Sequence, residues 1–264
     1  MNDASRGTVH VHSKRSHDGR LSYPELRAFL AGRGLRFACM TEHIEGLTQG
    51  DLERIIAECR THSDGEFAFV PGIEMDCFVI YFLGVRPVSV DFSSTRAIFD
   101  SLRPASRLCI LSHPVKARFE YPRWVLDACD GVEILNTKHD GHHYFRRGNE
   151  RLLQTVRRRQ PAAVGLAGMD FHEAKNFSDV HLRLNLSGTL REDAILDSLV
   201  AGDFEIFKGS EPLASLSPLR RALGRGRIVA MDAAHAMHRA LARRGLHLPP
   251  ALTRTLRRVV EGGG

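Results

Sequence analysis

The 264-residue sequence lacks the features that are typical of small disulfide-rich secreted proteins and of membrane proteins. It has only five cysteines, none in a CxxC pair, which argues against a disulfide framework and against a thiolate zinc site. No run of about 18 apolar residues is present, so no transmembrane helix is expected. The first residues, MNDASRGTV, lack the apolar segment of a signal peptide. We therefore expect a soluble, cytoplasmic protein with no membrane partner.

Two classes of nucleotide-binding protein are also disfavoured. One tryptophan and four tyrosines provide no obvious series of rings on which the bases of a single strand could stack. The glycine-rich stretch GRGRIV lacks the lysine and the spacing of a P-loop. A function through stacked bases or a Walker motif is therefore not predicted.

Basic residues are balanced by acidic ones through most of the chain and outnumber them only at its end. Residues 1–211 hold 27 Lys and Arg against 29 Asp and Glu, whereas residues 212–264 hold 10 Arg against 2 acids. Histidine is skewed the other way, with 11 of the 14 before position 182. We therefore predict two parts, a domain over residues 1–211 and an Arg-rich extension over 212–264 that could contact nucleic acid weakly and without sequence preference.

Short apolar runs alternate with helical patterns through the first part, which is typical of an α/β fold built from parallel βαβ units. Helix starts are predicted near Pro24, Asp51 and Ser93, and another helix over Arg191–Leu199. The predicted strands cover Thr8–Val11, Phe37–Met40, Phe67–Val70, Phe78–Val85, Leu108–Leu111, Gly131–Leu135 and Ala163–Ala167.

The extension has a helical pattern of its own. Apolar residues recur at helical spacing over Ile228–Leu241 and again at Leu252, Leu256 and Val259. Helices of this length are marginal in water unless an apolar face is buried. We expect these stripes to pack across the bottom or side of the first domain rather than to form a subunit interface, and the extension to be dispensable for metal binding but not for association.

Histidines and carboxylates follow the ends of the predicted strands. His10 and His12 are two residues apart on a strand, which places both imidazoles on one face. Similar residues occur in the segments SHDG, TEHIEG, PGIEMD, LSHP and GMDFH, each at or after the carboxyl end of a strand. Because parallel α/β folds build their sites at that end, and acids are rarely buried without a partner, the pattern predicts a divalent metal centre.

These motifs together resemble the PHP superfamily, named for its polymerase and histidinol phosphatase domains. HVHSKRSHDG is similar to the family's opening HxH and Asp-Gly, and TEHIEG, PGIEMD, LSHP and GMDFH are similar to its later motifs, in order. TLREDAILDSLVAGDFEIF resembles the segment that closes many such domains. The resemblance covers roughly residues 8–208 and implies a distorted seven-stranded β/α barrel with two or three divalent metal ions.

The same resemblance implies the metal ligands, with Glu74 as the bridge between two ions. These are His10, His12, Asp18, His43, Glu74, His113, Asp170 and His172. Some members of the family place another histidine between His113 and the closing motif. Here Glu133, Asn136, His139, His142 and His143 are all available in that region, and the sequence does not select one. Nitrogen and oxygen ligands without thiolate suit Zn, Mn or Fe.

A phosphoesterase is the function that the resemblance and the charges favour. Two ions held close together activate a bridging water for attack on phosphorus, and their charge attracts a small phosphorylated metabolite, nucleotide or sugar phosphate. Glu42 or His17 is the candidate acid for the leaving alcohol. Lys116, Arg118 and Lys138 are the candidate substrate-binding cations, since they follow predicted strand ends.

Two alternatives remain open from the sequence. The same centre could hydrolyse a carboxyl ester, a carbamate or an amide. The chain could also be a non-catalytic, metal-stabilised accessory module that binds nucleic acid or protein through its basic extension.

Overall fold

The computed structural model describes residues 5–141, 144–186 and 188–243. It contains α1 (Tyr23–Ala31), α2 (Gln49–Thr61), α3 (Thr95–Leu102), α4 (Arg123–Ala128), α5 (Arg147–Arg157), α6 (Glu192–Ala201), α7 (Pro218–Arg243) and the short 3₁₀ helices η1 (Ala174–Asn176) and η2 (Leu213–Ser215). The strands are β1 (Ser5–Val11), β2 (Phe37–Met40), β3 (Glu42–His43), β4 (Ala68–Val70), β5 (Gly72–Met75), β6 (Ile80–Leu83), β7 (Leu108–Leu111), β8 (Gly131–Asn136), β9 (Val164–Phe171), β10 (Val180–Leu184), β11 (Phe204–Lys208) and β12 (Glu211–Pro212).

The expected α/β class is confirmed, but a closed seven-stranded barrel is not shown. The described strands form one twelve-stranded sheet in the order β12-β11-β10-β1-β9-β8-β7-β6-β5-β3, with β2 and β4 attached beside β1. Two strands that were not predicted follow predicted ones after a single residue, β3 after Thr41 and β5 after Pro71, and proline has no N–H to donate to a neighbouring strand. In addition, β6 is antiparallel to both neighbours, and β10 to β12 extend the sheet antiparallel beyond β1.

The helices begin at capping residues close to the predicted starts. The Glu25 carboxylate accepts a hydrogen bond from the backbone N–H of Ser22 before α1, and Asp51 does the same for Thr48 before α2. The Ser94 side chain accepts from the N–H of Ala97 at the start of α3. The start of α2 therefore lies a few residues before the predicted one, because Asp51 is the third helical residue rather than the cap.

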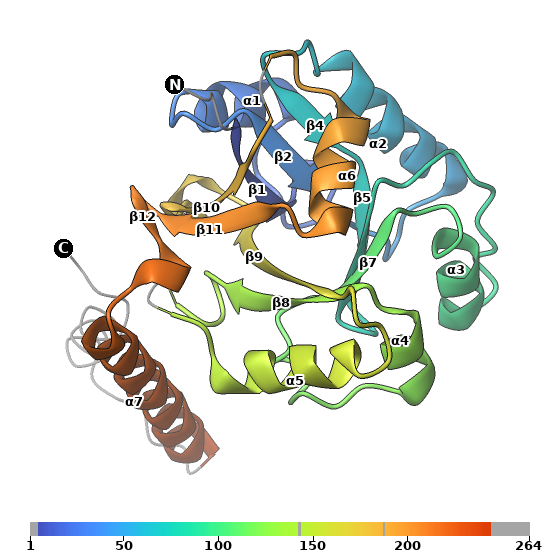
Figure 1. The fold of residues 1–264 in the computed structure, drawn as a ribbon. Helices are drawn as coiled ribbons and strands as arrows, with labels where there is room; N and C mark the ends of the chain where they lie inside the picture. The colour runs from blue at the N-terminus through green and yellow to red at the C-terminus, as the bar shows by residue number, and fades with distance from the viewer. Residues whose placement is uncertain (1–4, 142–143, 187, 244–264) are drawn as a thin grey trace.

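The interior of the curved sheet is apolar at one end and polar at the other. Ile195, Leu196 and Leu199 of α6 pack with inward-facing strand residues such as Val9 and Tyr81. Figure 1 shows α6 across the sheet, with α1, α2, α3, α4 and α5 around its outside. The other end, where the parallel strands finish, holds the buried histidines and carboxylates.

The helix predicted over Ile228–Leu241 is confirmed and begins ten residues earlier, at Pro218. It buries Ile228 and Met231 and leaves Leu219 and Leu223 exposed. The predicted stripe at Leu252, Leu256 and Val259 lies outside the described residues. Strand β12 ends at Pro212, beside the predicted boundary at residue 211. Among the described helices, none combines the length and the apolar character needed to cross a bilayer.

Candidate metal centre

All eight predicted ligands lie together at the ends of the strands. His10 is in β1, His43 in β3, Glu74 in β5 and Asp170 in β9, while the other four follow strands directly or in the next loop. Every one except Asp18 is buried. Within the described residues, the ligand atoms form several groups of three or four whose members lie within 4.8 Å of one another.

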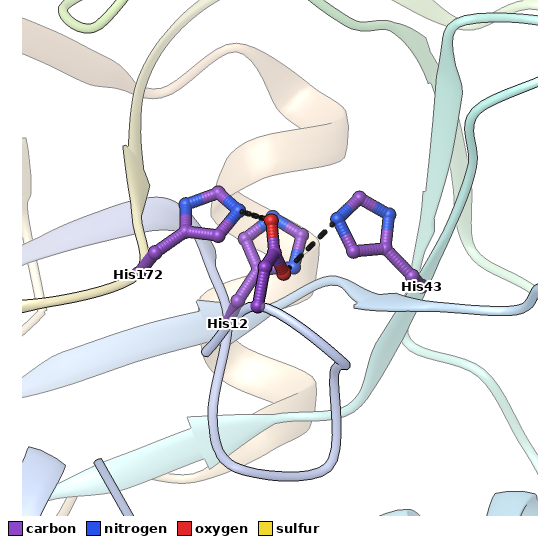
Figure 2. A group of neighbouring side chains, drawn as sticks. His12, His43 and His172 are labelled. Atoms are coloured by element: carbon purple, nitrogen blue, oxygen red, sulfur yellow. Dashed lines mark ion pairs between the residues drawn. The ribbon is translucent and has the colours of Figure 1, made fainter. Parts of the chain in front are cut away.

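The first group consists of His12, Asp18, His43 and His172. The Asp18 carboxylate lies 2.8 Å from His172 Nε2 and 3.5 Å from His43 Nε2. The His12 ring is stacked between the other two, with centroid distances of 4.5 Å to His43 and 4.2 Å to His172. Figure 2 shows the three rings turned toward one another.

Glu74 connects this group to the next. Its Oε2 lies 3.2 Å from His10 Nε2 and 3.3 Å from His12 Nε2, and its Oε1 lies 2.9 Å from His113 Nε2. Asp170 is placed similarly, with Oδ1 3.7 Å from His10 Nε2 and 3.8 Å from His12 Nε2. Glu74 therefore contacts His12 of the first group as well as His10 and His113 of the next, as expected for a bridging carboxylate.

His139 is the residue that the sequence did not select. Its Nε2 lies 3.0 Å from Asp170 Oδ2, and it forms a group with His113 and Asp170. His142 and His143 lie outside the described residues. The two non-histidine candidates, Glu133 and Asn136, lie behind the ligands, because Glu133 contacts His10 Nδ1 and Asn136 donates to Glu133.

The arrangement fits divalent metal ions. Eight buried side-chain polar atoms in the described residues lack a hydrogen-bond partner, and five of them belong to this centre. Those five are on Asp18, His43, His113, His139 and Asp170, and the atoms of the last two lie 3.0 Å apart without the geometry of a hydrogen bond. Buried polar atoms are normally satisfied, and imidazole and carboxylate donors suit Zn, Mn or Fe. The buried clusters could therefore hold divalent ions, whose identity the donor set does not fix.

The charges within the centre are strongly coupled. Burial lowers the pKa of His12 to about 3, so this imidazole is neutral at pH 7. Burial also acts to lower the pKa of His10, but the carboxylates of Glu74, Glu133 and Asp170 hold it well above its usual value. Burial raises the pKa of Glu74, and the charge and hydrogen bonds of His10 and His113 outweigh this, so its pKa lies well below the usual range.

The backbone is strained at three of the predicted ligands. His10, His113 and Asp170 have φ values of 65°, 21° and 52°, a region that costs a residue with a Cβ roughly 1–3 kcal/mol. The register of β1 also shifts between Val9 and Val11, on either side of His10. Strain of this kind persists only where the surrounding structure enforces it, and it concentrates at functional sites.

The two candidate acids lie in different surroundings. Glu42 is fully buried, and its carboxylate accepts hydrogen bonds from the hydroxyls of Ser13 and Ser16 at 2.5 and 2.6 Å. Glu42 therefore supports the loop after β1. Ser16, which donates to Glu42, also contacts His12 Nδ1. His17 is exposed, and its ring centroid lies 4.9 Å from that of His43, at the mouth of the centre.

Only one of the three candidate cations contacts the ligands directly. Lys138 Nζ lies 3.3 Å from Asp170 Oδ1 and 3.2 Å from His172 Nδ1. Lys116 is exposed and near enough to His139 that its charge adds to the effect of burial in lowering the pKa of that imidazole. Arg118 is exposed at a φ of 53°, and within the described part of the chain it makes no hydrogen bond or ion pair with the predicted ligands.

We expect metal binding to release about one proton from His10 at pH 7. The raised pKa keeps this imidazole protonated in the metal-free protein, and an ion that takes Nε2 must displace the proton. His12, with its pKa lowered to about 3, has none to release. Calorimetric titration of the metal-free protein with Zn²⁺ in two pH 7 buffers of different ionisation enthalpy measures the number. Equal heats in both buffers would contradict the expectation.

Comparisons with known proteins show a similarity of fold and do not identify a family. No protein-family model and no curated protein matches the chain. Among solved structures, PsfC from Pseudomonas syringae PB-5123 is 15% identical with a TM-score of 0.50, over 89% of this chain and 98% of that chain. An amidohydrolase from Chromobacterium violaceum, with bound sulfate and no metal, is 14% identical with a TM-score of 0.41, over 78% and 98%. The chain therefore shares an overall fold with PsfC along most of its length.

Proposed function

We propose that the protein is a metal-dependent hydrolase that cleaves small phosphate esters. The observation that carries the proposal is the sharing of Glu74 and Asp170 among adjoining groups of histidines, with the Lys138 ammonium beside Asp170. A cluster kept only to stabilise the fold does not need bridging carboxylates or a cation at its edge. The resemblance of the ordered motifs to PHP phosphatases supports the same reading.

The ligand groups define what each part of the site would do. His12, Asp18, His43 and His172 would hold one ion, and Glu74 and Asp170 would join it to ions held by His10, His113 and His139. Bound divalent ions would supply an activated water and neutralise the charge that develops on the phosphoryl oxygens. Net hydrolysis adds water to phosphorus, breaks the bond to the ester oxygen and transfers a proton to the leaving alcohol.

The side chains at the mouth would orient the substrate and manage that proton. Lys138 is placed to contact a phosphoryl oxygen as a point charge, and Lys116 extends the positive surface beside His139. His17 is exposed next to His43, where a ring N–H can reach the ester oxygen of a leaving group. Glu42 has no such position, since its oxygens are occupied by Ser13 and Ser16.

Replacing Lys138 by alanine should raise KM for a phosphate monoester by about tenfold or more and leave KM for a neutral carboxyl ester nearly unchanged. A hydrogen bond to a charged group contributes about 1.5–3 kcal/mol, and this one is made only to an anion. Steady-state kinetics on a panel of phosphomonoesters, phosphodiesters and carboxyl esters, after metal analysis of the purified protein, provides the measurement. Lys208→Ala, on strand β11, is the control and should behave as the wild type.

Two other results would favour the alternative functions. Equal or faster hydrolysis of neutral carboxyl esters or amides by the wild type would point to an esterase or amidase on the same centre. A protein that holds its metals and cleaves no member of the panel would favour the accessory module, and nucleic-acid binding by the extension would then be measured at two salt concentrations.

A further inference from the structure

A buried polar relay connects the C-terminal helix to the metal centre. Arg146, just before α5, is 7% exposed, and its Nε lies 2.7 Å from Asp140 Oδ1. The same guanidinium pairs through Nη1 with Asp232 of α7. Asp140 is fully buried, so Arg146 is the cation that compensates its charge. Through Asp232, α7 thus contacts the end of the loop between β8 and α5, a loop whose Tyr144 ring is also contacted by Arg225 of α7.

Asp140 transmits this constraint to the end of β8. Its Oδ2 accepts hydrogen bonds from the backbone N–H of Asn136 at 3.0 Å and from Asn149 Nδ2 at 2.7 Å. Asn136 then uses its own side-chain oxygen to accept from the N–H groups of Lys138 and His139, at 3.1 and 3.0 Å. The backbone positions of the cation and of the extra ligand are therefore set by Asn136.

The relay also reaches the ligands from behind. Asn136 Nδ2 donates to Glu133 Oε2 at 2.8 Å, and Glu133 Oε1 contacts His10 Nδ1 at 2.9 Å. Arg146 Nη2 lies 3.5 Å from the carbonyl oxygen of His139. Every step is a charged or amide hydrogen bond within a largely buried region, where such contacts rigidify a loop most effectively.

We propose that Asp232 is a positioning residue for the metal centre, and that α7 holds His139 and Lys138 in place through Arg146, Asp140 and Asn136. The extension is then not dispensable for metal binding, although it contributes no ligand. This inference rests on the metal centre of the proposed function and does not depend on which ester is cleaved. It assigns α7 a role in completing the group formed by His113, His139 and Asp170.

The test uses full-length protein freed of metal by a chelator and titrated with Co²⁺, followed by visible absorption. Asp232→Asn keeps the size of a half-exposed side chain and removes its charge, so the variant is expected to fold. Residues that support ligands typically contribute 10- to 100-fold to metal affinity, and we expect a loss in this range for one class of Co²⁺ site. His139→Ala, which removes the ligand itself, identifies that class. Asp232→Glu should restore most of the affinity.

Amide hydrogen exchange supplies a second readout that needs no metal. The N–H groups of Lys138 and His139 should exchange faster in Asp232→Asn, while the N–H groups of the central strands remain protected. Arg220→Ala is the matched control, because it removes another ion pair of α7, with Glu211, that has no link to the loop. It should bind Co²⁺ as the wild type does.

Several outcomes would overturn the proposal. The first is a wild-type Co²⁺ affinity together with unchanged amide exchange in Asp232→Asn. The second is a loss of Co²⁺ affinity in Arg220→Ala as large as that in Asp232→Asn, which would mean that any loosening of α7 has the same effect. If the wild type binds no Co²⁺, the metal centre fails as a proposal, and the exchange of the Lys138 and His139 amides still decides whether Asp232 orders the loop.

Discussion

Replacement of Glu74 by glutamine is expected to remove bound metal and lower phosphoesterase activity by more than 100-fold. Glu74 is 1% exposed, and its two oxygens contact nitrogens of His10, His12 and His113 at 2.9–3.3 Å. An amide keeps the volume but loses the charge and one of the two acceptor oxygens. Supporting residues contribute 10- to 100-fold to metal affinity, so a shared ligand should contribute more.

The measurement is metal content by mass spectrometry after dialysis, together with turnover of a phosphomonoester. Glu42→Gln is the matched control, because Glu42 is an equally buried glutamate on neighbouring strand β3, with contacts to Ser13, Ser16 and Tyr23 instead of ligands. With its amide oxygen toward Ser16, a glutamine keeps that contact, and its NH₂ can donate to the Ser13 hydroxyl, so this variant should keep its metal. A Glu74→Gln protein with full metal content and normal turnover would end the model of a shared carboxylate.

The sequence could place the eight predicted ligands together because they lie near the ends of apolar strands or in the loops that follow. A ligand such as His113 is marked by the run Leu108–Leu111 before it, and the ends of parallel strands meet at one edge of a sheet. Loops carry no such marker. His139 follows β8 by three residues, and two further histidines come soon after it in the sequence. Hydrogen bonds to the loop backbone, among them those that Asn136 makes, hold it near Asp170.

The sheet was harder to predict than the centre. The pattern of apolar runs gives the location of strands and not their direction, so the antiparallel β6 and the antiparallel extension from β10 to β12 were not foreseen. Nothing in the local pattern of α7 indicates Arg146 as its partner, since Asp232 is 86 residues away in sequence. Long-range charge pairs of this kind depend on how elements pack, and periodicity contains no information about them.

Glu133, which contacts the predicted ligands His10 and His113, is the second residue whose replacement we expect to lower metal affinity strongly. It is fully buried in β8, its Oε1 lies 2.9 Å from His10 Nδ1, and its Oε2 accepts from the backbone N–H of His113 at 2.7 Å. Gly168 on β9 leaves the space for this carboxylate, since a Cβ there would overlap Oε1. The carboxylate thus fixes the His10 ring with Nε2 toward Glu74, and it holds the backbone of His113 at its strained φ.

In Glu133→Gln we expect metal affinity to fall by about 10- to 100-fold while the fold is retained. The single amide oxygen would still be required by the N–H of His113 and the amide of Asn136, so the amide NH₂ would face His10 Nδ1. That contact favours the tautomer of His10 with its proton on Nε2, the nitrogen that must be free to bind an ion. The charge of Glu133 helps to raise the pKa of His10, so its loss favours this neutral tautomer over the doubly protonated ring of the wild type. Nitrogen-15 NMR of the metal-free histidines would report that change, and Co²⁺ titration would report the affinity. Glu42→Gln, which alters no contact of His10, should change neither measurement, and an unaltered His10 signal with wild-type affinity in Glu133→Gln would show that Glu133 only fills space between β8 and β9.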